Sequence, residues 1–139
     1  MKHKILIVDD EENILFITKA AFEQNYEVFT ATDGEQALEI IRREKPTLVF
    51  LDIKMPGKSG LEVLEEVVRL AFPPAVWMLT GDEDLDTALK TLNSGASGYV
   101  TKPFDLPRLR EIVLGAVEAA SSKEKRPSDR PWHVEKKKD

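Results

Sequence analysis

The sequence predicts an α/β fold in which one parallel sheet is covered by helices on both faces. Three continuous apolar runs, at residues 5–8, 48–51 and 75–79, are typical of strands that are buried on both sides. Segments whose apolar residues recur at helical spacing separate these runs, and strands that alternate with helices form parallel sheets. The chain has 139 residues, which is enough for one domain with a single hydrophobic core.

The first half of the chain is predicted to contain three strands and two helices. Ile14, Ile17 and Ala21 share one side of the first helix, because they recur every three or four residues. Pro46 ends the second helix, since proline lacks the backbone N–H that a helix interior needs. The predicted elements are a strand at 5–8, a helix at 11–24, a strand at 28–31, a helix from Asp33-Gly34 to residue 43, and a strand at 48–51.

The second half of the chain continues the same alternation. A loop at 54–60 contains Pro56 and Gly60. Asp105 is placed to cap the last helix, with Pro107 in its first turn. The predicted elements are a helix at 61–68, a strand at 75–79, a helix at 85–92, a strand at 99–101 and a helix with apolar residues from 109 to 117. This alternation predicts a flavodoxin-like, three-layer arrangement with strand order 2-1-3-4-5, whose ligand crevice lies between the first and third strands.

Charge divides the chain at about Ser121. The net charge is −5, but residues 1–120 hold 13 Lys and Arg against 21 Asp and Glu, whereas residues 121–139 hold 7 against 4. We therefore expect an acidic domain at 1–120 and, at 121–139, a basic tail or linker that is disordered, since it lacks apolar periodicity. Three consecutive lysines near its end are more often solvated than bound to nucleic acid, so we expect no nucleic-acid partner for this chain.

Composition excludes several classes of protein. The absence of cysteine excludes disulfides, thiolate metal sites and cysteine nucleophiles. No apolar run reaches the ~20 residues that a membrane helix needs. The first residues make a poor secretion signal, because carboxylates follow immediately after a short apolar run. We therefore expect a cytoplasmic protein that does not contact a membrane.

Three carboxylates are expected to meet at the carboxyl ends of the first and third strands. Asp9 and Asp10 follow the first strand, and Asp52 follows the third. Because these strands are predicted neighbours, the carboxylates would repel one another unless a cation lies among them. An all-oxygen site of high charge suits Mg²⁺ better than zinc or copper. The alternative is that the acidic run only stabilises the first turn of the following helix, which is the role expected for Glu11 and Glu12.

Asp52 is the candidate nucleophile, and Thr80 and Lys102 are candidate ligands of a phosphoryl group. A carboxylate can attack phosphorus and form an acyl phosphate. The Thr80 hydroxyl follows the strand at 75–79, where it can donate to a phosphoryl oxygen. Lys102 precedes Pro103, and a cis bond at this position would turn the chain sharply and hold the ammonium near Asp52. Taken singly, these residues also fit ordinary roles: a turn-capping aspartate, a threonine bonded to nearby backbone and a surface lysine.

Several short motifs surround these residues. They are the acidic pair at 9–10, D-I-K-M-P-G-K-S-G at 52–60, L-T-G at 79–81, G-A-S-G-Y at 95–99 and T-K-P-F at 101–104. Together they resemble the receiver domain of two-component response regulators, and the resemblance covers residues 1–120. It implies a signalling domain that catalyses only its own phosphorylation and dephosphorylation, rather than an enzyme with an external substrate.

The resemblance implies a metal site and a phosphoryl acceptor. It implies that Asp10 and Asp52 bind Mg²⁺ directly, and that Asp9 binds it directly or through water. The backbone carbonyl of Lys54 would supply a further ligand. Asp52 would then accept a phosphoryl group from a histidine kinase or a histidine phosphotransfer protein.

The resemblance also implies a conformational switch. Thr80 and Lys102 would bind the phosphoryl group, and Tyr99 would turn inward as Thr80 moves. The surface formed by the last two predicted helices and the strand between them is therefore expected to bind an output partner or a second copy of the chain. Lys54 and Asp82 are expected to flank the path of the water that attacks the acyl phosphate, and a pair between them would slow dephosphorylation.

Three rival functions share either the fold or the chemistry. A flavodoxin binds flavin, but its first loop must cradle a phosphate, which the run D-D-E-E would repel. A phosphatase of the haloacid dehalogenase type needs its nucleophile after the first strand in a D-x-D pattern, which this run does not match. The third alternative is a receiver-like module that has the same fold but binds partners without being phosphorylated. The full set of polar site residues argues against it.

Overall fold

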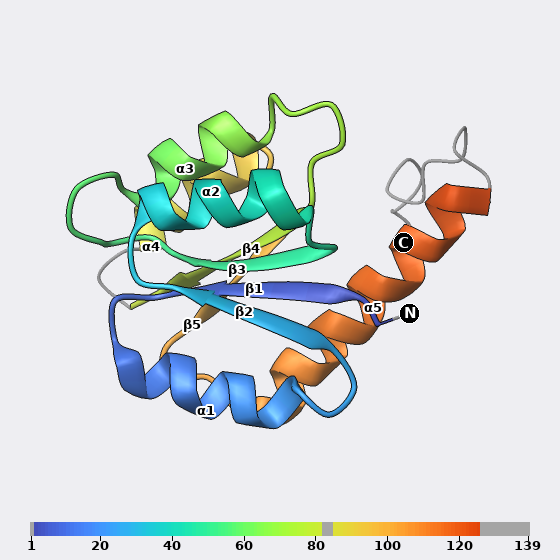
Figure 1. The fold of residues 1–139 in the computed structure, drawn as a ribbon. Helices are drawn as coiled ribbons and strands as arrows, with labels where there is room; N and C mark the ends of the chain where they lie inside the picture. The colour runs from blue at the N-terminus through green and yellow to red at the C-terminus, as the bar shows by residue number, and fades with distance from the viewer. Residues whose placement is uncertain (1, 82–84, 126–139) are drawn as a thin grey trace, which may run out of the picture.

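The computed structural model describes residues 2–81 and 85–125, and within them five strands alternate with five helices (Figure 1). All strand pairs are parallel, and the sheet has the order β2-β1-β3-β4-β5, which confirms the predicted topology. The elements are β1 Lys4–Val8, α1 Glu12–Phe22, β2 Glu27–Ala31, α2 Gly34–Glu44, β3 Leu48–Asp52, α3 Gly60–Val67, β4 Ala75–Thr80, α4 Leu85–Asn93, β5 Gly98–Thr101 and α5 Leu106–Lys125.

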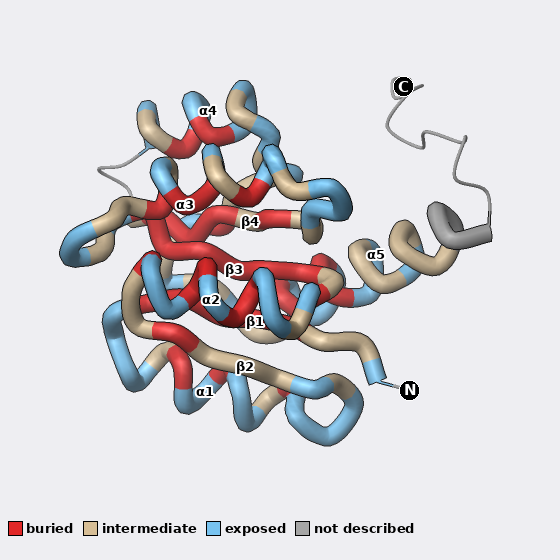
Figure 2. Tube along the Cα trace, turned by 45° about the horizontal axis from the view of Figure 1, so that its top comes forward, coloured by how far each residue is buried: buried red, intermediate tan, exposed pale blue. Residues whose placement is uncertain are grey.

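Two apolar cores lie on opposite faces of the sheet. Because successive residues of a strand point to opposite faces, Leu6 and Val8 pack against α2, α3 and α4, while Ile5 and Ile7 pack against α1 and α5. Figure 1 shows the sheet between these two helical layers, and Figure 2 shows that β3 is buried along its length. Full burial of each such side chain contributes about 1.5–3 kcal/mol, so the strands predicted as apolar supply the stability of the fold.

Side-chain caps fix the first turns of α2 and α3. The Asp33 carboxylate accepts a hydrogen bond from the Gln36 backbone N–H at 2.8 Å. Before α3, the Ser59 hydroxyl accepts from the Glu62 N–H at 3.2 Å, while the Glu62 carboxylate accepts from the Ser59 N–H at 2.9 Å. This reciprocal capping box stabilises the start of α3. The S-x-x-E pattern at 59–62 is the sequence signature of this cap, which was not among the predicted ones.

The β3–α3 loop, residues 53–59, is closed at its base by backbone contact between its two ends. The Gly60 N–H donates to the Ile53 carbonyl at 2.8 Å. A β-carbon at Gly60 would overlap the Asp52 carbonyl oxygen and would lie 2.8 Å from Ile53 Cα, so only glycine permits this approach. At the tip of the loop, Gly57 has a φ of +74°, which favours glycine. Because Asp52 directly precedes the loop, this closure also fixes the end of β3.

The last helix runs past the change in composition at Ser121. α5 ends at Lys125, so the segment 121–125 continues the helix where the sequence predicted the start of an irregular tail. Residues 126–139 lie outside the described residues, and the division of the chain at residue 120 therefore stays a prediction. In the described part of the chain, no helix has the length and apolar character needed to cross a membrane.

We predict that Gly60→Ala destabilises the fold by about 2–4 kcal/mol, because the atoms around the new methyl group belong to the backbone and cannot move aside. Gly115→Ala is the matched control. A β-carbon at Gly115 in α5 would meet no atom within 4 Å, and alanine favours helix, so stability should rise by up to about 1 kcal/mol. Urea unfolding followed by circular dichroism measures both variants, and equal stability would contradict the packing at Gly60.

Candidate functional site

Three carboxylates lie together at the carboxyl ends of β1 and β3. These strands pair with Val8 opposite Leu51, so Asp9 and Asp10 come next to Asp52. The three aspartates each offer a carboxylate oxygen, and these oxygens all lie within 4.8 Å of one another. Asp9 and Asp52 are buried, whereas Asp10 is exposed. The topology thus brings together the three carboxylates that the sequence predicted for a metal site.

The Lys102 ammonium lies among acidic side chains at this edge of the sheet. Its Nζ atom is 2.9 Å from Asp9 Oδ2, 3.6 Å from Asp52 Oδ1 and 3.6 Å from Glu11 Oε1. The backbone N–H of Lys102 donates to the last carbonyl of β4 at 2.7 Å, which anchors the residue there. The bond between Lys102 and Pro103 is cis. The contact with Glu11 was missed, because the sequence assigned this residue only to the first turn of α1.

The surroundings of Asp52 raise the pKa of its carboxyl group above the ordinary value for aspartate. Burial contributes most to raising its pKa, and the Asp9 carboxylate raises it further. The Lys102 ammonium lowers the pKa, Asp10 raises it, and a backbone hydrogen bond from Lys54 lowers it, with the result that the pKa is about 7. Additional positive charge at this site would therefore favour the ionised form that a nucleophile needs.

The ion pair between Lys102 and Asp9 raises the pKa of the lysine, and it leaves one oxygen of the aspartate without an aligned hydrogen bond. Burial alone would lower the pKa of Lys102, but the contact with Asp9 and the charges of Asp52 and Glu11 outweigh it and raise the pKa above its ordinary value. Asp9 Oδ2 is buried and receives no aligned hydrogen bond from the described residues, even though the Lys102 ammonium is 2.9 Å away. A buried oxygen of this kind has a lone pair free to bind a cation.

The donor set fits a hard divalent cation. Every ligand that the cluster of Asp9, Asp10 and Asp52 offers is a carboxylate oxygen, and the single positive charge of Lys102 leaves the cluster acidic. Oxygen ligands of high charge suit Mg²⁺ or Ca²⁺ rather than zinc or copper. The residues present are therefore chemically suited to the cation that the sequence predicted.

The remaining predicted residues surround these strand ends. Thr80 ends β4 and is buried, and its hydroxyl donates to the next residue's carbonyl at 3.0 Å. Tyr99 of β5 is half-buried and packs against the core beneath α2, α3 and α4. The side chain of Lys54 is exposed, and its backbone N–H donates to the Asp52 carboxylate. Asp82 lies outside the described residues, so its pairing with Lys54 stays a prediction.

Comparison with known proteins agrees with this geometry. Residues 5–114 match the family model described as the response regulator receiver domain. The chain is 37% identical over 114 residues to the sporulation initiation phosphotransferase F of Bacillus subtilis (strain 168), a match that covers 81% of this chain and 92% of that protein. It is 41% identical over 132 residues to the alkaline phosphatase synthesis transcriptional regulatory protein PhoP of the same organism, with 89% of this chain and 54% of that protein covered.

A solved structure gives the same result at the level of the fold. The response regulator receiver domain protein (CheY-like) from Methanospirillum hungatei JF-1 has a TM-score of 0.83 and 33% sequence identity to this chain. The match covers 88% of this chain and 99% of that one. The chain thus corresponds to the whole of one relative's structure and to about half the length of PhoP.

We predict that Asp52→Asn stabilises the protein at pH 8 in EDTA by about 1–3 kcal/mol and has little effect at pH 4. The pKa of an unfolded aspartate is about 3.9, whereas the folded pKa is about 7. Between these values the folded state holds a proton that the unfolded state has released, so the wild-type protein loses stability as the pH rises through this window. Asparagine mimics the protonated group and escapes this loss.

Urea unfolding at a series of pH values in EDTA measures the difference. Asp86→Asn, at an exposed aspartate in the first turn of α4, is the control that removes the same charge from a residue outside the cluster. A gain for Asp52→Asn that does not change with pH would show that the wild-type carboxyl group does not titrate in this window.

Proposed function

The chain belongs to the family of response regulator receiver domains, and on that basis we propose that Asp52 accepts a phosphoryl group from a histidine kinase or a histidine phosphotransfer protein. The observation that supports this most is the buried Asp52 carboxylate, which has the Lys102 ammonium 3.6 Å away. A carboxylate can attack phosphorus, and a fixed cation beside it can stabilise the charge that the transfer places on the phosphoryl oxygens.

The proposed transfer exchanges one bond to phosphorus for another. An Asp52 carboxylate oxygen forms a bond to phosphorus while the P–N bond of the donor phosphohistidine breaks. The donor nitrogen keeps the electron pair of that bond and takes up a proton, so the products are an aspartyl phosphate and a neutral histidine. The Lys102 ammonium moves from Asp9 toward a phosphoryl oxygen, and the Thr80 hydroxyl donates to another.

We propose that the acidic cluster holds Mg²⁺ during this reaction. Asp9, Asp10 and Asp52 would supply carboxylate oxygens, and the Lys54 carbonyl would supply a further ligand. When bound, Mg²⁺ offsets the repulsion among the carboxylates and the negative charge of the phosphoryl oxygens. The clustered oxygens and the buried Asp9 oxygen without an aligned donor support this assignment.

Phosphorylation is proposed to change the surface formed by α4, β5 and α5. The Thr80 hydroxyl would exchange its local carbonyl partner for a phosphoryl oxygen. Because β4 pairs with β5, a shift at Thr80 reaches Tyr99 on the neighbouring strand. This surface already carries an apolar strip, to which an output partner or a second copy would bind. The strip consists of the exposed leucines of α4, Leu85, Leu89 and Leu92.

We predict that acetyl phosphate adds a single phosphoryl group to the protein when Mg²⁺ is present. Asp52→Asn should carry no adduct, because the amide cannot attack phosphorus to form an acyl phosphate. Intact-mass analysis measures the adduct, with a parallel sample in EDTA. Asp86→Asn is the control, and it should be phosphorylated like the wild-type protein.

The outcomes of this experiment separate the two functions that fit the fold. A Mg²⁺-dependent adduct that Asp52→Asn abolishes is the result expected of a phosphorylated receiver. No adduct on the wild-type protein, together with no binding of beryllofluoride, would favour a module that binds partners without phosphorylation. An adduct that persists in Asp52→Asn would place the acceptor at another residue.

We predict that Thr80→Ala separates phosphorylation from the conformational response. The Asp52 nucleophile is intact in this variant, so the mass adduct should still form. The variant lacks the hydroxyl that would exchange its local carbonyl partner for a phosphoryl oxygen. Amide chemical-shift changes on addition of beryllofluoride should therefore be largely lost in α4 and at Tyr99. Thr101→Ala, at the exposed residue opposite Thr80 on β5, is the control and should respond like the wild-type protein. A full response in Thr80→Ala would contradict the proposed coupling.

A further inference from the structure

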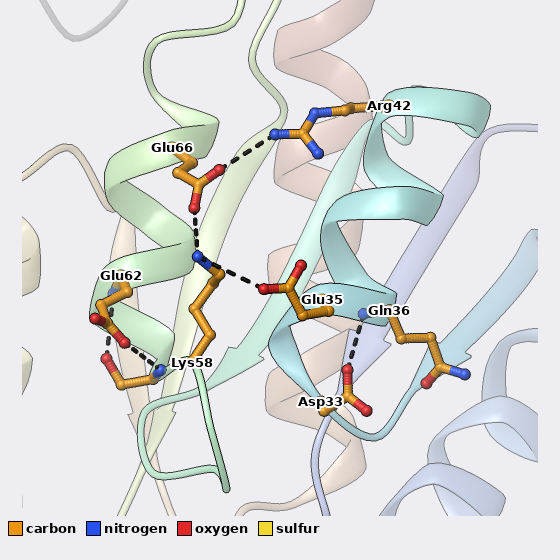
Figure 3. Close-up of polar contacts among 8 residues, drawn as sticks. Asp33, Glu35, Gln36, Arg42, Lys58, Glu62 and Glu66 are labelled. Atoms are coloured by element: carbon orange, nitrogen blue, oxygen red, sulfur yellow. Dashed lines mark hydrogen bonds and ion pairs between the residues drawn. The ribbon is translucent and has the colours of Figure 1, made fainter.

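Lys58, in the β3–α3 loop, is held by charged residues of two helices (Figure 3). Its ammonium lies 2.7 Å from Glu66 Oε2 in α3 and 3.8 Å from Glu35 Oε2 in α2. Glu66 also pairs with Arg42 of α2, whose Nη2 atom lies 3.2 Å from Glu66 Oε1. We call these four residues the Lys58 network. The network ties the loop that follows Asp52 to both neighbouring helices.

The charges of the Lys58 network stabilise one another. The hydrogen bond to Glu66 raises the pKa of Lys58, and the same bond lowers the pKa of Glu66, which Arg42 lowers further. Exposure limits this effect, since 25% of the Lys58 side chain is accessible and salt screens such pairs. A single exposed ion pair contributes little, but here one ammonium binds carboxylates on two different elements, and this geometry restrains the loop.

The backbone at Lys58 also packs directly against the first turn of α2. A β-carbon at Gly34 would lie 3.0 Å from both Lys58 Cβ and the Lys58 carbonyl oxygen. The loop therefore approaches the start of α2 closely at this point, beside Val63 of α3, whose Cγ2 atom would lie 2.8 Å from the same β-carbon. Beside this contact, the two segments line an open hollow that reaches Asp10 of the acidic cluster. The position of Lys58 thus determines where one wall of this hollow lies.

We propose that Lys58 is a positioning residue for the metal site. Its network holds the β3–α3 loop in the position where the Lys54 N–H donates to Asp52 and the Lys54 carbonyl can bind the cation. This inference rests on the proposed function, of which the cation is a part. The loop is closed at Ile53 by the hydrogen bond from Gly60 and is held at Lys58 by the network. Lys54 lies between these two fixed points.

The contact between Lys54 and Asp52 links the position of the β3–α3 loop to the position of the proposed nucleophile. The Lys54 N–H donates to the Asp52 carboxylate, so a displacement of the loop changes the position of the proposed nucleophile directly. The same displacement would move the Lys54 carbonyl, the proposed further ligand of the cation. Groups that orient metal ligands in this way contribute to metal affinity without touching the metal.

The test compares the Mg²⁺ affinity of three variants with that of the wild-type protein, by isothermal titration calorimetry at low salt. Lys58→Met keeps a long side chain against Gly34 and removes the charge, whereas Lys58→Arg keeps the charge. Lys4→Met is the matched control. Lys4 makes a comparable ion pair with Glu44 at 2.9 Å, with 33% of its side chain exposed, but at the opposite end of β1 from the acidic cluster.

We expect Lys58→Met to weaken Mg²⁺ binding about three- to fivefold, the upper end of what an exposed ion-pair network contributes. Lys58→Arg and Lys4→Met should stay within about twofold of the wild-type protein. The loss should shrink at about 1 M salt, which screens the network. Hydrogen exchange of the Lys54 amide, followed by NMR, should become faster in Lys58→Met while exchange in β1 stays unchanged, since a loss of global stability would affect both.

The outcomes distinguish this inference from the proposed function. If the wild-type protein binds no Mg²⁺, the proposed function fails and the inference fails with it. If the wild-type protein binds Mg²⁺ and Lys58→Met binds it equally well, with the same exchange at Lys54, only the inference is wrong. An equal loss in Lys4→Met would also overturn it, because the effect would then not depend on the loop.

Discussion

The repulsion among Asp9, Asp10 and Asp52 is the constraint on which the rest of the site depends. Pairing of β1 with β3 brings their carboxylates together, and burial of two of them removes the water that would screen their charges. Lys102 supplies one positive charge, but it lies closer to Asp9 than to Asp52. Burial of Asp52 and the nearby Asp9 carboxylate therefore raise its pKa to about 7, because Lys102 offsets them only in part. A site in this condition favours the binding of a divalent cation, and the proposed phosphoryl transfer depends on that cation and on the ammonium to offset the charge of the phosphoryl oxygens.

The fold can hold such a destabilising cluster because the apolar cores that stabilise it are separate from the clustered charges. The cores on both faces of the sheet are apolar, with strand side chains such as Leu6 and Ile7 fully or almost fully buried. The charged residues of the cluster lie at the carboxyl ends of the strands or directly after them, where the backbone is fixed by local contacts. Closure of the β3–α3 loop at Gly60 and the capping box at Ser59 are two of these contacts. They position the carboxyl end of β3 without requiring attraction between the aspartates.

Strand order, and the meeting of the candidate site residues at one edge of the sheet, could be predicted from the sequence because both depend on local patterns and one general rule. Apolar runs mark the buried strands, and the carboxyl ends of parallel strands meet at one edge, so Asp9, Asp52 and Lys102 were expected together. The pairing of Lys102 with Glu11, and of Lys58 with Glu66, could not be predicted in this way. Charged residues are common on helix surfaces, and which of them meet depends on how the helices pack. The end of α5 was missed for a related reason, since a change in charge composition does not itself end a helix.

The charge of Lys58 and its hold on the loop have opposite effects on the affinity for a divalent cation, so an experiment can tell the two effects apart. Lys58 and Arg42 carry two positive charges, and Glu66 and Glu35 carry two negative ones, so the network is neutral as a whole. Removing the Lys58 charge leaves a net negative charge near the acidic cluster, which by long-range attraction alone would strengthen the binding of a divalent cation. Displacement of the loop would weaken it. The direction in which the affinity changes therefore separates the two effects, and a loss that Lys4→Met does not share would arise through the position of the loop.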